Sequence, residues 1–331
     1  MIDKLSYVLC DETEPYHNLA LEEYLLSQVE EGECILYLWQ NRRTVVIGKN
    51  QNAWKECRVR ELEQDGGFLA RRLSGGGAVF HDLGNLNFTF LLRREDYGLG
   101  RQLRVIEEAA RSLGIEARRS GRNDVLAAGR KFSGNAFYLG ERGCYHHGTL
   151  LVDVDMENLS RYLCVPPDKL QSKGVDSVRA RVVNLSALCG GLTVEGMKAA
   201  MLEAFGKVFG GAPRPLEPGR LQGEQIAALR ERYASWAWRF GRDIPFQYEL
   251  SHRFSWGGID IRLAVRAGEV AEAAVYSDAM DAPFIDQVRS ALRGCRFSRE
   301  ELCKRLAGLP LCDERAAMRA DVLALLEREN F

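Results

Sequence analysis

The segment that most constrains this chain is a run of three glycines set between two arginines and a histidine. It reads Arg71-Arg72-Leu73-Ser74-Gly75-Gly76-Gly77-Ala78-Val79-Phe80-His81-Asp82. Glycine lets a backbone take positive φ and approach a ligand closely, and successive N–H groups can then form an anion-binding concavity. Arginine beside such a loop supplies forked, charged donors for phosphate or carboxylate. The segment therefore predicts an anion site at a turn, although three glycines alone would equally fit a flexible surface turn.

The residues around this loop exclude the two common glycine motifs of nucleotide-binding proteins. No Gly-Lys-Ser/Thr ends the segment, so it is not a P-loop, and a strand rather than a helix follows it, so it is not a dinucleotide-binding turn. That strand is expected at residues 85–91, where Leu86, Phe88 and Phe90 alternate with polar residues. An apolar strand face of this kind suits an alkyl chain or an ordinary core equally well.

A second polar segment surrounds a hairpin predicted at residues 124–139, with its turn near Ala128-Gly129-Arg130. Lys131 would begin the returning strand, where a fixed ammonium could face a phosphoryl group as negative charge develops. Asp124 could hold Mg²⁺ through a carboxylate oxygen. A solvated hairpin with ordinary surface charges accounts for the same spacing.

Two adjacent histidines, His146 and His147, stand at the start of a strand predicted at residues 147–153. Neighbouring strand residues point to opposite faces, so these two would not readily ligate one metal, and only one of them could face a pocket. A hydrogen-bonded structural role is the commoner fate of either. Further along, residues 173–185 mix basic with small residues, which fits a mobile loop that closes over a nucleotide or a plain surface loop.

The remaining pattern predicts a mixed sheet flanked by helices and then a smaller α/β domain. Helices are expected at 14–31, from 103 to a stop at Gly114, and at 193–209 with Thr193 as cap, and strands at 34–39 and 44–48. After a boundary near 241–249, strict alternation over 259–265, a turn at 267–269 and helices at 283–292, 298–307 and 314–328 build the second domain. The predicted domains are residues 1–245 and 250–331.

Charge and targeting signals exclude several classes of protein. The 331 residues carry 45 basic and 46 acidic side chains, a net charge of −1, so bulk electrostatics gives no case for nucleic acid or membrane binding. The amino terminus lacks the features of a signal peptide, and no apolar stretch reaches the roughly 18 residues of a membrane span. Nine scattered cysteines form no CxxC pair, so we expect reduced thiols in a cytoplasmic protein.

Taken together, these segments resemble the lipoate–protein ligase A family over nearly the whole chain. The resemblance is carried by Asn18-Leu19-Ala20-Leu21-Glu22-Glu23, Trp39, Thr44-Val45-Val46-Ile47-Gly48, residues 71–85, Gly121-Arg122-Asn123-Asp124, Arg130-Lys131-Phe132-Ser133-Gly134, His146-His147-Gly148-Thr149-Leu150-Leu151 and Ser177-Val178-Arg179-Ala180-Arg181-Val182. The combination is specific, whereas the glycines alone are not. It implies an α+β fold, the mixed-sheet biotin/lipoate ligase domain related to class II aminoacyl-tRNA synthetases, with a small C-terminal accessory domain.

The resemblance also implies an activity and a set of site residues. Lipoate would be activated by ATP and Mg²⁺ as lipoyl-AMP and passed to a lysine of a lipoyl domain of a 2-oxoacid dehydrogenase complex or of the glycine-cleavage H protein, with Lys131 as the catalytic residue. ATP and the adenylate are expected at Arg72, Gly77, Ala78, Val79, Phe80, Asn123, Asp124, Lys131, Lys173 and Arg179. Lipoate is expected at Trp39, Arg72, Ser74, His81, Lys131, Ser133, Gly134, His147 and Thr149, and Mg²⁺ at Asp124.

Three alternatives remain open at this point. An octanoyl or lipoyl transferase would use a cysteine nucleophile and no ATP, and Cys144, two residues before His146, is its candidate. A biotin ligase is disfavoured because Ala-Val-Phe-His follows the three glycines. A non-catalytic protein that holds lipoyl-AMP would keep the same loop, although the presence of Lys131 and Asp124 argues against it.

Overall fold

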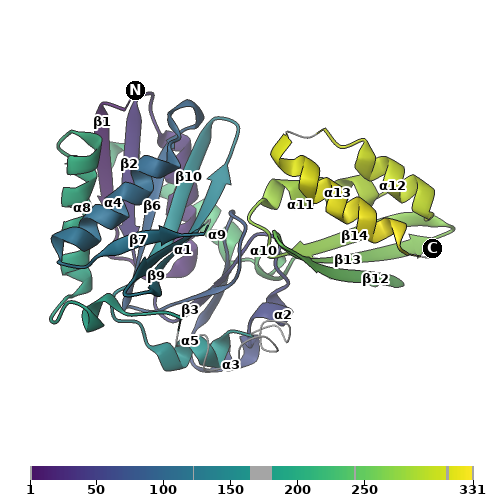
Figure 1. Cartoon of the computed structure of the whole chain (residues 1–331), viewed down its shortest axis with the longest axis horizontal. Helices are drawn as coiled ribbons and strands as arrows, with labels where there is room; N and C mark the ends of the chain where they lie inside the picture. Colours follow the sequence, from purple (N-terminus) through teal and green to yellow (C-terminus); the bar gives the residue numbers. More distant parts are fainter. Residues whose placement is uncertain (1, 122, 165–180, 242–243, 311–312, 330–331) are drawn as a thin grey trace. The chain divides into compact units, whose positions relative to one another are not determined.

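The computed structural model describes residues 2–121, 123–164, 181–241, 244–310 and 313–329. These residues form two compact units, which we describe separately. The first unit comprises Met1–Val46, Lys55–Arg71 and Ala78–Arg239, and the second comprises Ile47–Trp54, Arg72–Gly77 and Phe240–Phe331 (Figure 1). The glycine-rich segment is therefore divided: Arg72–Gly77, with all three glycines, belongs to the second unit, and Arg71 and the residues from Ala78 onward belong to the first.

An eight-stranded mixed sheet forms the centre of the first unit. Its strand order is β11-β1-β2-β6-β10-β9-β8-β7, in which β11, β1 and β2 run parallel and the remaining pairs are antiparallel. The strands are β1 (Lys4–Leu9), β2 (Glu33–Trp39), β6 (Asn85–Arg93), β7 (Ala117–Ser120), β8 (Asp124–Ala127), β9 (Arg130–Leu139), β10 (Gly143–Leu151) and β11 (Arg214–Pro215). A smaller sheet, β4-β3-β5, consists of β3 (Thr44–Ile47), β4 (Phe68–Arg71) and β5 (Val79–His81).

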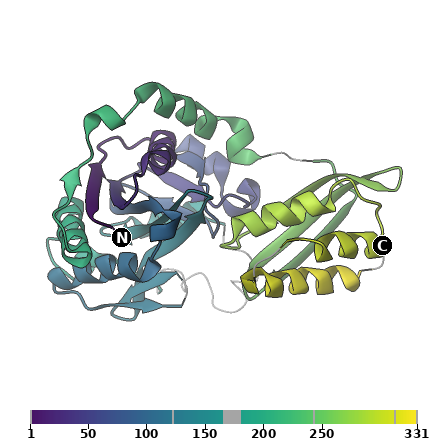
Figure 2. The ribbon, with the colours of Figure 1, turned by 90° about the horizontal axis from the view of Figure 1, so that it is seen from above.

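Helices cover both faces of the large sheet (Figures 1 and 2). On one face, α4 (Leu99–Ser112) and α8 (Val194–Phe209) pack together and enclose the main apolar core. On the other face, α1 (Pro15–Gln28) lies against β2, β6 and β10, and α9 (Gly223–Ala234) packs against α1. The Oγ1 atom of Thr193 accepts from the Gly196 amide, so the predicted cap of α8 is confirmed.

The first unit also contains short helices, most of which the sequence pattern did not predict. They are α2 (Ala53–Glu56), which begins within the second unit, α3 (Val59–Gln64), α5 (Met156–Tyr162) and α10 (Trp236–Phe240), with the 3₁₀ turns η1 (Arg94–Asp96), η2 (Leu185–Ala187) and η3 (Pro218–Arg220). Each is about two turns or less, which is too short for a periodic apolar pattern to emerge.

The C-terminal part of the second unit is a three-stranded antiparallel sheet with three helices. The strands are β12 (Tyr248–Phe254), β13 (Gly257–Arg266) and β14 (Glu269–Ser277), and the helices are α11 (Ala282–Leu292), α12 (Arg299–Ala307) and α13 (Asp313–Glu327). Ala267 and Gly268 both take positive φ, so the predicted β13–β14 turn is confirmed. The three helices predicted after it are confirmed as α11, α12 and α13. The apolar side chains of β13, β14 and these helices enclose a core of their own.

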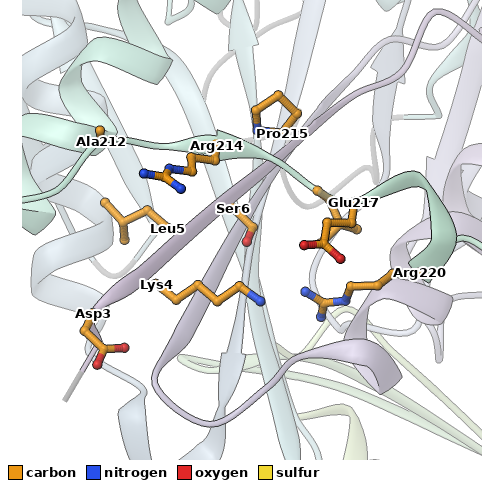
Figure 3. Close-up of a pocket in the computed structure, with 10 residues that line it drawn as sticks. Asp3, Lys4, Leu5, Ser6, Ala212, Arg214, Pro215, Glu217 and Arg220 are labelled. Atoms are coloured by element: carbon orange, nitrogen blue, oxygen red, sulfur yellow. The ribbon is translucent and has the colours of Figure 1, made fainter.

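A cavity of about 500 Å³ lies beside the edge strand β11 and its neighbour β1 in the first unit (Figure 3). Its lining residues are Asp3, Lys4, Leu5, Ser6, Ala212, Arg214, Pro215, Leu216, Glu217 and Arg220. The Arg220 guanidinium donates to both oxygens of the fully buried Glu33 at 2.8 Å, and Ser6 Oγ donates to one of them at 2.5 Å. Lys4 Nζ forms an ion pair with Glu30 at 2.8 Å, so two of the cations that line this cavity, Lys4 and Arg220, are engaged by carboxylates.

None of the helices in the described part of the chain combines the length and the apolar composition needed to cross a bilayer.

Candidate active site

A row of residues crosses the sheet face that α1 covers, one from each of five neighbouring strands. From β2 to β8 the directly paired residues are Trp39, Asn87, Thr149, Gly134 and Asp124. Directly paired residues project from the same face of a sheet. Four residues that the sequence analysis assigned to ATP or lipoate therefore lie on one line, although 110 positions separate Trp39 from Thr149 in the sequence.

A second row lies two residues along the same face and contains Tyr37, Thr89 and His147. Glu22 reaches this row from α1, and only 1% of its surface is exposed. Its Oε1 atom accepts from Thr89 Oγ1 at 2.7 Å and lies 2.8 Å from His147 Nδ1, while the Trp39 indole N–H donates to Thr89 Oγ1 at 3.2 Å. The two rows are thus joined into one buried polar network on the α1 side of the sheet.

The alternating residues of the same strands face α4 and α8 instead. His146 is fully buried among Phe88, Phe90 and Phe137, and its Nε2 lies 2.7 Å from Asn135 Oδ1. Burial, together with the neighbouring His147, lowers the pKa of His146 well below its usual range. The prediction that the adjacent histidines face opposite sides is confirmed, and His146 is the structural one.

This alternation decides between two alternatives for one strand and limits one predicted contact of the acyl pocket. Leu86, Phe88 and Phe90 belong to the core under α8, so they are core residues and do not present a surface to an alkyl chain on the α1 side. Ser133 pairs with Leu150 and Val125 of the same core and is fully buried. Its side chain therefore points away from the row of Gly134 and Thr149, and its predicted contact with lipoate is restricted to the backbone.

Lys131 presents its ammonium on the site face beside Gly134. Its Nζ forms an ion pair with Asp124 Oδ1 at 2.7 Å, and about a third of each side chain remains exposed. A Cβ added at Gly134 would lie 2.9 Å from both Lys131 Nζ and Cε, so the glycine provides the space in which the lysine lies. The Lys131 amide donates to Arg181 O at 2.7 Å and its carbonyl accepts from the Val183 amide at 2.9 Å, which holds the lysine backbone from the other side.

His81, at the end of β5, approaches the first row from the neighbouring small sheet. It is buried, its ring lies 6.2 Å from that of Trp39 in an edge-on arrangement, and its backbone pairs with Thr44 of β3. The Nδ1 atom lies 3.2 Å from Nδ2 of the buried Asn41. His81 therefore joins the same network as Trp39, as its assignment to the acyl pocket requires.

The two adjacent arginines of the glycine-rich segment have different partners. Arg71 donates to the carbonyls of Trp238 and Arg239 in the first unit, at 2.9 Å and 2.7 Å, which secures α10. Arg72, in the second unit, donates to Ser74 Oγ at 3.0 Å, and through Nη2 to the carbonyls of Gly75 and Gly77 at 2.7 Å and 2.8 Å. The loop is folded around this guanidinium, so a carboxylate or phosphate bound by Arg72 would replace these carbonyl oxygens.

The same loop packs against the start of α11 within the second unit. The Gly76 amide donates to Ala279 O at 3.0 Å, and Gly76 takes a φ of +92°. Lys49 and Asp286 form an ion pair at 2.7 Å, and Asn50 Nδ2 donates to Ala282 O at 2.9 Å. Residues 47–54 and 72–77 are thus fixed to the C-terminal part of the chain by both backbone and side-chain contacts.

The remaining predicted ATP residues lie at the edges of these clusters. Val79 and Phe80 are on β5, directly after Ala78, and the Phe80 ring contacts that of Tyr162 at 5.7 Å. The Asn123 carbonyl accepts from the Asn135 amide and side chain at 2.9 Å and 3.0 Å. Lys173 and Arg179 lie outside the described residues.

Cys144, the candidate nucleophile of the transferase alternative, lies on the wrong face of the sheet. It is fully buried on the α4/α8 side, and its Sγ lies 3.6 Å from the carbonyls of Leu92 and Arg93. Burial raises the pKa of this thiol to about 12. A buried, protonated thiol is a poor nucleophile, so the geometry does not support covalent catalysis at Cys144.

Five members of the network were not predicted from the sequence as site residues: Glu22, Tyr37, Asn41, Asn87 and Thr89. Glu22 was noted only as part of a family motif, although a carboxylate among the apolar residues of α1 is unusual enough to be a signal. Asn41 and Thr89 carry no such local signal, because their partners are 40 and 67 positions away along the chain. Among the residues that the structure describes, no group of three or more His, Cys, Asp or Glu side chains could hold a metal ion.

Comparison with known proteins agrees with this geometry. The model of the lipoyl protein ligase A/B catalytic domain matches residues 14–206, and that of the bacterial lipoate protein ligase C-terminus matches residues 243–326. A protein of Psychrobacter cryohalolentis named lipoate-protein ligase A is 39% identical over 298 residues, which cover 88% of each chain.

Solved structures show the same similarity in three dimensions. The crystal structure of P. falciparum LipL1 in complex with lipoate superposes with a TM-score of 0.84 at 27% identity and covers 96% of this chain and 99% of that one. A bipartite lipoate protein ligase of Thermoplasma acidophilum, described together with its E2 lipoyl domain, has a TM-score of 0.64 at 26% identity, with 74% and 99% coverage.

Proposed function

The chain belongs to the lipoate–protein ligase A family, and from this premise we propose that it activates lipoate with ATP and transfers the lipoyl group to a lysine of an acceptor protein. The observation that carries the proposal is the Lys131 ammonium, presented beside Gly134 and Thr149 on the same sheet face as Trp39 and His147. A cation at one end of a buried row that has an aromatic side chain, Trp39, at its other end suits a substrate with a carboxylate head and an alkyl tail.

The reaction has two steps that place different demands on the site. A lipoate oxygen first attacks the α-phosphorus of ATP, which forms a P–O bond and releases pyrophosphate. The acceptor lysine then attacks the acyl carbonyl through its neutral ε-amine, loses a proton, and displaces AMP as the C–O bond breaks. Because the first step joins two anions, it needs fixed positive charge at their meeting point.

Lys131 and Arg72 supply that charge in this proposal. The ion pair with Asp124 holds the Lys131 ammonium in the site. When the substrate binds, the ammonium would leave Asp124 and pair with the substrate phosphate instead. Arg72 would exchange the carbonyls of Gly75 and Gly77 for substrate oxygens. Mg²⁺ commonly takes one or two carboxylates and otherwise nucleotide phosphates, so Asp124, the carboxylate paired with Lys131, would hold an ion bound together with ATP, and that ion would offset the charge of the phosphates.

The other predicted contacts extend this site in both directions. We assign the acyl chain to Trp39, His81, His147 and Thr149, together with Ser74 and the backbone at Gly134 and Ser133. Besides Arg72 and Lys131, the nucleotide is assigned to Gly77, Ala78, Val79, Phe80, Asn123 and Asp124, and to Lys173 and Arg179, which lie outside the described residues. Residues 1–245 would then act as the catalytic domain and residues 250–331 as the accessory domain.

The acceptors are proposed from the same family membership. The archaeal relative is described with an E2 lipoyl domain, which supports lipoyl domains of 2-oxoacid dehydrogenase complexes, and the glycine-cleavage H protein is the second candidate. Such acceptors are soluble lysine-bearing domains, so the proposed reaction requires neither nucleic acid nor a membrane and would take place in the cytoplasm.

Lipoate-dependent ATP–pyrophosphate exchange tests the proposal directly, because a ligase shows it, whereas a cysteine transferase or a passive binder of lipoyl-AMP does not. We expect Lys131→Ala to abolish exchange while the protein stays folded, since removing a charge that acts in the transition state costs about 10²-fold or more. Cys144→Ser is the matched control and should keep nearly full exchange. Unchanged exchange in Lys131→Ala would remove this lysine from the mechanism, and loss of acyl transfer in Cys144→Ser would favour the transferase.

A further inference from the structure

We propose that Asn18 and Asn41 fix the tautomer of His81, so that this histidine meets the acyl group as a hydrogen-bond donor through Nε2–H. The two asparagines are positioning residues, because each acts through a neighbour. The place of the acyl group rests on the proposed function. The tautomer itself follows from hydrogen bonds within the first unit.

The orientation of the Asn18 amide is determined by its surroundings. Its Nδ2 lies 3.0 Å from Glu12 O, 2.8 Å from Gln40 O and 3.0 Å from Asn41 Oδ1. Two of these three partners are backbone carbonyls, which can only accept, so the atom between them must be the nitrogen. On the other side, the Tyr37 hydroxyl donates to Asn18 Oδ1 at 3.2 Å. Burial raises the pKa of Tyr37 well above its usual range, so it remains a donor.

The orientation of the Asn18 amide determines that of the Asn41 amide, and the Asn41 amide determines the tautomer of His81. Since Asn18 donates to it, the Asn41 atom nearest Asn18 must be the oxygen, which leaves Asn41 Nδ2 facing His81 Nδ1 at 3.2 Å. Two N–H groups cannot face each other in a hydrogen bond, so Nδ1 carries the lone pair and accepts. A neutral imidazole has one proton, and here it must be on Nε2. All three residues are buried, so water does not compete for these positions.

His147, on the same sheet face, has the opposite tautomer. Its Nδ1 lies 2.8 Å from Glu22 Oε1, and a carboxylate oxygen that already accepts from Thr89 accepts from His147 as well. The proton is therefore on Nδ1 of His147. The two histidines assigned to the acyl pocket thus differ because one is backed by an amide and the other by a carboxylate.

This assignment decides what His81 can do in the reaction. A histidine with a protonated Nε2 and an occupied Nδ1 cannot take the proton of the acceptor lysine, so His81 is excluded as the base. It can donate to an oxygen of the lipoate carboxylate, and then to the acyl oxygen as negative charge develops there during attack by the amine. Asn41 and Asn18 keep that donor in place and unable to change its role.

The tautomer can be measured without any substrate. In protein labelled with ¹⁵N-histidine, long-range ¹H–¹⁵N correlation separates protonated from unprotonated ring nitrogens, and the signals of His81 are assigned by their absence from His81→Gln. We expect Nε2 of His81 to be protonated and Nδ1 to be unprotonated. A proton on Nδ1 would overturn the inference, whatever the outcome of the activity measurements on the proposed function.

The functional consequence is tested with Asn41→Asp, which keeps the shape but offers only acceptors. It should move the His81 proton to Nδ1 and remove the donor, so kcat/KM for lipoate in ATP–pyrophosphate exchange should fall about 10- to 100-fold, the range expected for one hydrogen bond to a charged group. The KM for ATP should stay unchanged. Wild-type exchange in Asn41→Asp, with the tautomer reversed, would show that the donor has no role.

The His81→Ala background separates this effect from a general effect of the new charge. Alanine has no ring nitrogen whose protonation residue 41 could set, whereas a glutamine amide would turn over in response to the same change. In His81→Ala, which should itself lower the exchange rate, the additional change Asn41→Asp should alter the remaining rate by less than about twofold. An equal loss in both backgrounds would mean that Asn41 acts through charge or folding and would overturn the inference. Urea unfolding of each variant verifies that the compared proteins are folded.

Discussion

Glu22 and Glu33 are both buried carboxylates of the first unit, yet their partners give them different roles. Glu33 accepts from both Arg220 nitrogens, from Ser6 and from the Glu30 amide, so its charge is compensated by hydrogen bonds, two of them from the cavity-lining Arg220. Glu22 has no arginine or lysine among its hydrogen-bond partners in the described residues and instead accepts from Thr89 and His147. Compensation makes Glu33 a structural residue, whereas Glu22 orients groups of the site.

The charge of Glu33 predicts a specific dependence of stability on pH. Burial alone would raise its pKa, but the Arg220, Ser6 and Glu30 hydrogen bonds outweigh burial and lower it to about 2 from an ordinary value of 4.5. A depressed pKa stabilises the folded state above about pH 4.5, and this stabilisation is lost as the pH falls towards 2. The shift corresponds to about 3 kcal/mol.

Urea unfolding of wild type and Glu33→Gln at several pH values measures this contribution. The difference in the free energy of unfolding between them should be greatest near pH 7 and should shrink between pH 4.5 and 2. The glutamine removes the titration but keeps the shape, and all other carboxylates titrate in both proteins. A difference that stayed constant from pH 7 to pH 3 would contradict the assignment.

Two glycines on adjacent strands allow the role of β9 and β10 in the site to be separated from their role in the fold. A Cβ at Gly148 would lie 2.6 Å from Gly134 O and 2.7 Å from Phe88 Cζ, so backbone and core would have to move. We expect Gly148→Ala to lower the free energy of unfolding by about 1–3 kcal/mol. At Gly134 the nearest atoms are the mobile Cε and Nζ of Lys131, each at 2.9 Å.

Gly134→Ala should therefore displace the Lys131 ammonium while the sheet stays intact. We expect a change in stability within about 1 kcal/mol and a fall in lipoate-dependent exchange of at least about 10-fold, since small misplacements of a reacting group are costly. Exchange assays and urea unfolding on both variants test the pair. Full activity in a folded Gly134→Ala would show that the position of Lys131 does not limit the reaction.

At the same scale, the sequence predicted those elements whose signal is local. The alternation of residues 85–91 and 259–265 and the cap at Thr193 sufficed for β6, β13 and α8. Strand β7 could not be predicted in this way, because three of its four residues are polar and exposed. Its strand conformation comes from pairing with β8, which is a tertiary effect that overrides propensity.

The candidate site shows the same limit. The glycine-rich, lysine-containing and histidine-containing segments could each be recognised, but the network that links them depends on partners far apart in sequence. Glu22 joins α1 to β10 across 125 positions. No local pattern reports that distance.

At the scale of the whole molecule, the compact units do not follow a single cut in the sequence. Composition and periodicity predict one boundary near residue 245. They cannot show that a short segment far before this boundary packs with the second unit. The second unit includes Ile47–Trp54 and Arg72–Gly77, which precede that boundary by about 170 residues or more. The glycine-rich loop, which carries the proposed Arg72 contact, is thus stabilised by residues from the far end of the chain.

Gly75→Ala tests whether the C-terminal part of the chain maintains the shape of this loop. A Cβ at Gly75 would lie 2.3 Å from Ala279 O and 2.5 Å from Met280 O, and neither backbone carbonyl can swing aside as a flexible side chain could. The loop should therefore separate from the start of α11 and lose the hydrogen bond from the Gly76 amide to Ala279 O. We expect the Gly76 amide to exchange with solvent faster and the free energy of unfolding to fall by about 1–3 kcal/mol.

Gly77→Ala is the matched control, because a Cβ at Gly77 meets no atom within 4 Å. This variant should leave both quantities unchanged. Hydrogen exchange of residues 72–77 measures the difference, and equal protection in the two variants would show that the loop keeps its shape without the C-terminal residues.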